Sequence, residues 1–152
     1  MTRRREYFSL EEANAILPTL EYYFRQLALV QRDLYAAQQA LQAGGARAEG
    51  GGIILPSAAG EELPWWRDRY TELCHRYDRI MEEILAHGVE VIDPEAGIVH
   101  FYALYDGEEV VFSWQYGETA IQFWCDTGEP FHQRRPLRQL FADAPSALTP
   151  RH

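Results

Sequence analysis

Hydrophobic residues in the first third of the chain recur alternately every four and every three residues. The series is Ile16, Leu20, Tyr23, Leu27, Val30, Leu34, Ala37 and Leu41. This spacing places the side chains on one helix face and is typical of the seam between packed helices. Ser9 and Glu12 have the spacing of a capping box, and the pattern ends at Gly44. Pro18 is expected to kink or break this helix near its first turns.

A second series with the same spacing follows further along the chain. Its members are Trp66, Tyr70, Leu73, Tyr77, Ile80, Ile84 and His87. Pro64 suits the first turn of such a helix, and Gly88 suits the left-handed residue that ends it. Two helices with matching seams predict an antiparallel helical hairpin over about residues 9–87.

The connection between the two predicted helices, about residues 43–61, divides into two parts. Residues 44–52 are rich in glycine and alanine, which favours a flexible loop. An apolar stretch follows, and the apolar residues at this end of the hairpin are Ile53, Ile54, Leu55, Trp65 and Trp66. The plainer interpretation is that the loop folds back over the hairpin tip. The alternative is an exposed apolar patch that binds a partner or a second subunit.

After Gly88 the hydrophobic period changes to two, which predicts β-strands at about residues 89–92, 98–105, 108–115 and 120–125. Asp106-Gly107 is a strong signal for a two-residue β-hairpin turn. The chain is therefore expected to be an α+β protein of one domain, residues 1–152. The helical hairpin would pack on one face of an antiparallel β-meander of three to four strands, over about residues 89–126. The tail, residues 127–152, is expected to be irregular, with Arg134, Arg135 and Arg138 solvated.

The predicted turn pairs Tyr105 with Glu108 and therefore His100 with Ser113. One face of the sheet, expected to pack on the helices, carries Val99, Phe101, Ala103, Tyr105, Val110, Phe112, Trp114, Ile121, Phe123 and Cys125. The outer face carries Ile98, His100, Tyr102, Leu104, Val111, Ser113, Gln115, Gln122 and Trp124. This outer face is unusually aromatic for a surface in contact with water.

Four side chains on the outer face form the candidate ligand site: His100, Tyr102, Ser113 and Trp124. An imidazole, two hydroxyls and an indole could together bind a small molecule, but a partly covered face or a subunit interface is the favoured explanation, because convergent polar groups alone define a site weakly. A hydrolytic pair of Ser113 and His100 lacks a nucleophile-elbow sequence and an evident orienting acid. No catalytic residue is therefore assigned. Cys-x-x-Cys and His-x-x-x-His spacings are absent, so neither a metal nor another cofactor is expected.

Composition narrows the possible partners. The formal net charge of −9 argues against nucleic acid and anionic membranes, which both carry dense negative charge. All fourteen basic residues are arginine, which excludes lysine Schiff-base chemistry and a P-loop. No apolar run is long enough to span a bilayer, and no export signal is evident. A cytoplasmic protein in which Cys74 and Cys125 are free thiols is expected.

Several segments resemble a bacterial family known as domain of unknown function 2203. They are residues 7–18, 88–93 and 97–99, then Trp114, Gly117-Glu118, Trp124, Phe131 and residues 134–137. The resemblance implies one domain and supplies no activity. It implies that four residues have mainly structural roles. They are Trp114 in the core, Gly117 in a turn, Glu118 and Arg134. The family pattern has aspartate at position 100, cysteine at 113 and histidine at 125, where this chain has His100, Ser113 and Cys125. The predicted register places positions 100 and 125 on opposite faces, which argues against a shared metal ion.

Taken together, the residues favour a non-catalytic interaction or scaffold protein that self-associates through its helical hairpin or apolar tip. The alternative is a protein that binds a small ligand or metal on the outer face of the sheet. An enzyme is the third possibility and would need a deep pocket that holds His100 beside an acidic group.

Overall fold

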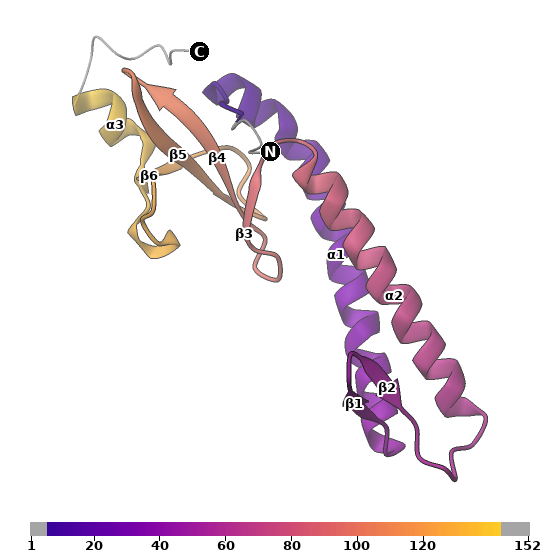
Figure 1. The fold of residues 1–152 in the computed structure, drawn as a ribbon. Helices are drawn as coiled ribbons and strands as arrows, with labels where there is room; N and C mark the ends of the chain where they lie inside the picture. Colours follow the sequence, from indigo (N-terminus) through magenta and orange to yellow (C-terminus); the bar gives the residue numbers. More distant parts are fainter. Residues whose placement is uncertain (1–5, 144–152) are drawn as a thin grey trace. The chain divides into compact units, whose positions relative to one another are not determined.

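A computed structural model describes residues 6–143 and contains helices and antiparallel sheets, as the α+β prediction requires (Figure 1). The helices are α1 (Leu10–Ala43), α2 (Glu62–Leu85) and α3 (Leu137–Asp143). Contacts divide the chain into two compact units. The first contains the described residues up to Phe24 and from Glu83 onward, and the second runs from Arg25 to Glu82. The expected single domain stays a prediction.

Helix α1 begins with the predicted capping box. The Ser9 backbone N–H donates to Glu12 Oε1 at 2.8 Å, and the Glu12 N–H donates to Ser9 Oγ at 3.0 Å. The helix continues through Pro18, so the expected break does not occur. Proline removes one backbone hydrogen bond, and the burial of Leu17 and Leu20 on either side offsets that loss.

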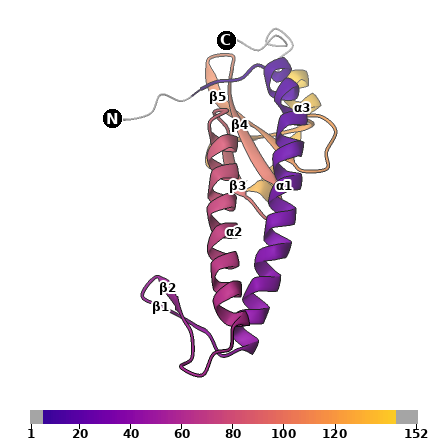
Figure 2. The same cartoon turned by 90° about the vertical axis from the view of Figure 1, so that its right-hand side faces the viewer.

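Within the second unit, α1 and α2 lie side by side in both views (Figures 1 and 2). Arg69 pairs with Asp33 at 3.7 Å. At the end of the pair, Gly44 packs so closely on Leu63 that an added Cβ would lie 2.4 Å from a leucine methyl. The two helices therefore run antiparallel, as the matching seams predict.

The loop between these helices is more ordered than expected. It contains a two-stranded antiparallel sheet of β1 (Arg47–Glu49) and β2 (Gly52–Ile54). Gly50 and Gly51 join the strands with φ angles of 62° and 81°. Two successive positive φ angles are what a tight hairpin turn requires, so these glycines form a turn and not a flexible linker.

The first unit contains a five-stranded sheet in the order β3-β4-β5-β6-β7. Its strands are β3 (Glu90–Asp93), β4 (Ile98–Tyr105), β5 (Glu108–Gln115), β6 (Phe123–Asp126) and β7 (Arg135–Pro136). All four pairings are antiparallel. The expected three to four strands are thus too few, because the segment predicted to be an irregular tail contributes β7, the 3₁₀ helix η1 (Phe131–Gln133) and α3.

The register confirms one predicted pairing and corrects another. His100 lies opposite Ser113, as the Asp106-Gly107 turn predicts. In β6, however, Trp124 pairs with Phe112, and Phe123 pairs with Ser113. Directly paired residues share a face, so Trp124 lies on the Phe112 face while Phe123 and Cys125 lie on the His100 face. The predicted faces of these three residues are therefore wrong.

Both faces of the sheet are buried. On one face, the Phe8 and Phe101 rings meet edge to face at 5.3 Å, and the Phe24 and Trp114 rings are 6.1 Å apart. The first turns of α1 thus cover that face. The opposite face, called the His100 face below, contains the buried residues Ile98, His100, Val111, Ser113 and Cys125. Among the residues that the structure describes, no helix is long and apolar enough to cross a membrane.

Candidate functional site

Two buried polar side chains lie next to each other on the His100 face. His100 is 5% exposed, and Ser113, opposite it on β5, is fully buried. Neither His100 Nε2 nor Ser113 Oγ has a hydrogen-bond partner in the described part of the chain. A buried polar group without a partner costs about 1–3 kcal/mol. The pair therefore offers a donor and an acceptor to any small polar molecule that enters.

Charged groups on either side influence the His100 imidazole. Burial lowers its pKa, the Glu90 carboxylate raises it, and the Arg134 guanidinium lowers it further. Glu90 lies opposite His100 on β3 and accepts a 2.8 Å hydrogen bond from the Tyr102 hydroxyl. Because burial is the largest effect, His100 is expected to be neutral near pH 7.

The segment after β6 contributes Arg134, which was expected to be solvated. Its guanidinium forms a two-pronged ion pair with Glu118, with distances of 3.0 and 2.8 Å. The same group lies 4.1 Å from the ring centre of Phe123 and 4.2 Å from that of Phe131. Phe123 belongs to the His100 face, so Arg134 lies over that face. Sequence reasoning missed this contact, because nothing local marks a partner sixteen residues away.

Only three of the four predicted ligand residues share a face. Tyr102 lies two residues from His100 on β4, and Ser113 pairs with His100. Trp124 lies on the other face, where the Arg135 guanidinium stacks 4.2 Å from its ring centre. The structure therefore separates Trp124 from the others.

Cys125, and not Trp124, lies on the His100 face. Its side chain is fully buried, and burial, followed by the Glu129 carboxylate, raises the pKa of its thiol. The argument that positions 100 and 125 lie on opposite faces is thus wrong. Nevertheless, no group of three or more His, Cys, Asp or Glu residues within the described part of the chain is placed to hold a metal ion.

The apolar tip of the helical pair is partly open to solvent. Trp65 is 58% exposed and Ile54 is 45% exposed. Ile53, Leu55 and Trp66 are half-buried. The two indole rings meet edge to face at 4.9 Å. Beside them is a surface hollow of about 700 Å³, called the tip hollow below; its apolar lining includes Ala43, Pro56, Ala59, Leu63 and Trp66.

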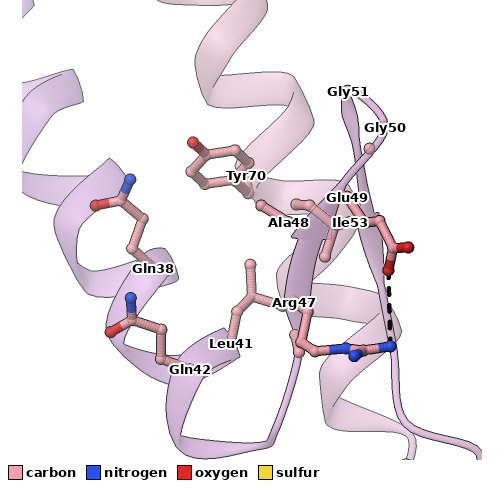
Figure 3. A pocket seen from close by; sticks show the side chains of 12 residues that line it. Gln38, Leu41, Gln42, Arg47, Ala48, Glu49, Gly50, Gly51, Ile53 and Tyr70 are labelled. Carbon is pink, nitrogen blue, oxygen red and sulfur yellow. Dashed lines mark ion pairs between the residues drawn. The ribbon is translucent and has the colours of Figure 1, made fainter.

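A second pocket, called the strand pocket below, lies between β1–β2 and the helices (Figure 3). Its volume is about 520 Å³. Leu41, Ala48 and Ile53 form its apolar part, and Gln38, Gln42 and Tyr70 contribute polar groups. The sequence offered only a weak signal for it, since Gln38 and Gln42 lie one helical turn apart beside a seam leucine.

Residues 6–137 match the family model described as an uncharacterized conserved protein, DUF2203. The chain belongs to the DUF2203 family. No curated protein and no solved structure matches the chain. The DUF2203 match extends over both compact units, so the His100 face, the tip hollow and the strand pocket all lie within it.

Several residues that carry the DUF2203 resemblance have clear structural roles here. Trp114 is fully buried, and its indole N–H donates to the Glu118 carbonyl at 2.9 Å. Gly117 turns the chain with a φ of 107°. Residues 100, 113 and 125, which the sequence comparison singled out, lie on one face of the sheet.

Proposed function

We propose that this DUF2203 protein is a non-catalytic interaction protein that forms a homodimer through the tip of its helical pair. The observation that supports this function is the exposure of Trp65 beside the apolar tip hollow. An exposed indole and an apolar hollow on the same surface allow two copies to interlock. Each copy would insert Trp65 into the hollow of the other, which makes a symmetric, self-complementary contact.

The size of the expected contact can be estimated from the indole. Trp65 is 58% exposed, so two copies would bury roughly 290 Å² if a tryptophan offers about 250 Å². At about 25 cal/mol per Å², this gives about 7 kcal/mol. Loss of translational and rotational freedom opposes association by about 4 kcal/mol or more. The remaining roughly 3 kcal/mol corresponds to a Kd above about 1 mM, so a weak dimer with a Kd of roughly micromolar size requires Ile54 and Leu55 to add about 200 Å² of buried apolar area.

Sedimentation equilibrium between about 1 and about 200 µM tests this proposal, because the range brackets micromolar dissociation constants. The natural chain should change from monomer to dimer, whereas Trp65→Ser should stay monomeric. Tyr22→Ser is the matched control, since Tyr22 is a 55% exposed aromatic residue on the other unit. The proposal is wrong if the natural chain is monomeric throughout, or if Trp65→Ser dimerises as well as Tyr22→Ser does.

A second candidate function rests on His100 and Ser113. Their adjacent, buried and unpartnered polar atoms would be satisfied by a small polar molecule that both donates and accepts hydrogen bonds. Tyr102 on the same face could contribute to such a site. Because Ser113 is fully buried and His100 is 5% exposed, the molecule bound between them would be small.

Native mass spectrometry of gently purified protein tests the second candidate. A retained small molecule should be present in the natural chain and lost in His100→Ala. Trp124→Phe should keep it, because Trp124 lies on the opposite face. An unliganded natural chain, or equal loss in both variants, would contradict binding at this face.

A further inference from the structure

The strand pocket has the chemistry of a small-molecule site that is independent of dimerisation. It is formed by three separate pieces of the second unit: the last turns of α1, the strands β1 and β2, and Tyr70 of α2. Its volume of about 520 Å³ lies within the range of about 300–1,000 Å³ that is typical of ligand sites.

Part of the strand pocket is apolar. Ala46, Ala48 and Ile53 provide its accessible apolar surface, and Leu41, which is 5% exposed, lies beneath them. Figure 3 shows Ala48 and Ile53 on the strands, with Leu41 on the neighbouring turn of α1. Such a surface favours an aliphatic or aromatic body, whose burial contributes about 25 cal/mol per Å².

Three polar side chains at the pocket have no hydrogen bond to another side chain of the described residues. Gln38, Gln42 and the Tyr70 hydroxyl line the pocket, and none of them hydrogen-bonds to another side chain among residues 6–143. Two carboxamides and a phenol can both donate and accept hydrogen bonds. They match the carbonyl and N–H groups of an amide.

Charge in the pocket is balanced. Arg47 and Glu49 are its only charged lining residues, and they pair with each other at 3.7 Å (Figure 3). Both side chains are exposed, at 73% and 64%. A charged ligand would therefore lose hydration without gaining an unpaired opposite charge.

We infer that the strand pocket binds a neutral small molecule that has an aromatic or aliphatic body and an amide-like polar edge. The two glutamines bind the polar edge, and Ala48 and Ile53 contact the apolar body. Binding at this site requires neither Trp65 nor the tip hollow, so it does not rest on the proposed dimer.

The test uses a panel of neutral aromatic amides, from benzamide to N-benzylbenzamide, with benzoate and benzylamine as charged counterparts. Binding is measured by ¹H–¹⁵N chemical-shift titration of the full-length Trp65→Ser variant, so that dimerisation does not interfere. The neutral amides should shift resonances of residues around Gln38, Gln42 and Tyr70, and affinity should rise with the size of the apolar body. The charged counterparts should bind at least about fivefold more weakly, since the polar edge of the pocket is formed by neutral carboxamides and its two charged side chains pair with each other.

Variants on one helix complete the test. Gln38→Glu and Gln42→Glu introduce a charge into the pocket and should weaken amide binding about fivefold or more, because a lost hydrogen bond alone costs about 0.5–1.5 kcal/mol. Gln39→Glu is the matched control, because Gln39 is also an exposed glutamine on α1 but does not line the pocket. The inference is overturned if no amide binds, if benzoate binds equally well, or if Gln39→Glu weakens binding as much as its neighbours do.

Discussion

The ion pair between Glu118 and Arg134 should contribute more to stability than any surface pair in the protein. Glu118 Oε1 accepts hydrogen bonds from Arg134 Nη1 at 3.0 Å and from the Gln115 backbone N–H at 2.8 Å. Glu118 Oε2 accepts from Nη2 at 2.8 Å. The arginine and glutamate side chains are only 16% and 19% exposed. Removing either one leaves a mostly buried charge without its partner.

The magnitude follows from that burial. Breaking a fully buried pair costs about 3–5 kcal/mol, and the remaining exposure reduces this to about 2–4 kcal/mol for Glu118→Ala. Arg134→Ala should cost at least about 1 kcal/mol more than this, since it also removes two cation–π contacts of about 0.5–2 kcal/mol each. The double variant should be more stable than the sum of the two losses implies. The coupling energy should be about 1.5–3 kcal/mol, as expected for charge-assisted, two-pronged hydrogen bonds.

Urea denaturation, followed by tryptophan fluorescence and far-UV circular dichroism, measures the four free energies of unfolding that the cycle needs. Arg76 and Glu72 supply the matched control, because their side chains are 49% and 60% exposed and lie 4.0 Å apart. Their coupling should stay below about 0.5 kcal/mol and fall further in high salt. If the Glu118 and Arg134 losses add to within about 0.5 kcal/mol, the claim that this pair stabilises the fold is refuted.

Two further predictions concern pH and backbone strain. The folded-state pKa of His100 is lowered. At pH values around the usual histidine pKa of about 6.5, the unfolded chain therefore binds more protons than the folded chain does. The contribution of His100 to stability should therefore be constant above about pH 7.5 and fall as the pH drops through about 6.5, by at most about 1.4 kcal/mol per pH unit. Urea titrations of the natural chain and His100→Asn at several pH values measure this, and identical pH profiles would contradict it. Gly97→Ala should destabilise the fold by at least about 2–3 kcal/mol. The φ angle of Gly97 is 72°, a left-handed conformation that alone costs an alanine about 1–2 kcal/mol. The new Cβ would also lie 2.5 Å from the Tyr116 Cβ, which adds a steric collision. Gly128→Ala, with φ of 89° and nothing within 4 Å, should incur only the backbone cost, so equal losses in the two variants would disprove the collision.

Local signals predicted those parts of the fold that short stretches of chain determine by themselves. The Ser9 and Glu12 capping box, the two long helices and the Asp106-Gly107 turn are all present. The turn is the clearest case. Because a two-residue hairpin fixes the pairing of the strands beside it, it placed His100 opposite Ser113 correctly, although the two residues are thirteen positions apart.

The register of β6 could not be obtained in this way. Residues 116–122 connect it to β5, and a connection of that length does not determine pairing by turn type. Its position depends on distant contacts: the Ile121 backbone N–H donates to Asn14 Oδ1 of α1 at 2.7 Å, and Arg134 binds Glu118. Because side chains alternate between faces, a shift of one residue moves every side chain of the strand to the other face. This is why the candidate site included Trp124 and omitted Cys125.

The composition of the outer face nevertheless indicated that it is unusual for a surface in contact with water. A sheet covered by helices on one side normally exposes polar residues on the other, yet β4 and β5 place Ile98, Tyr102, Leu104 and Val111 beside His100. A strand pair that is apolar on both faces requires a second covering layer. Here the residues after β6 supply part of that layer through Arg134 and Phe131, although their sequence lacks helical or strand periodicity. Any ligand of His100 would therefore bind inside the protein, beneath this layer, and replacing Arg134 should increase access to the imidazole as well as lower stability.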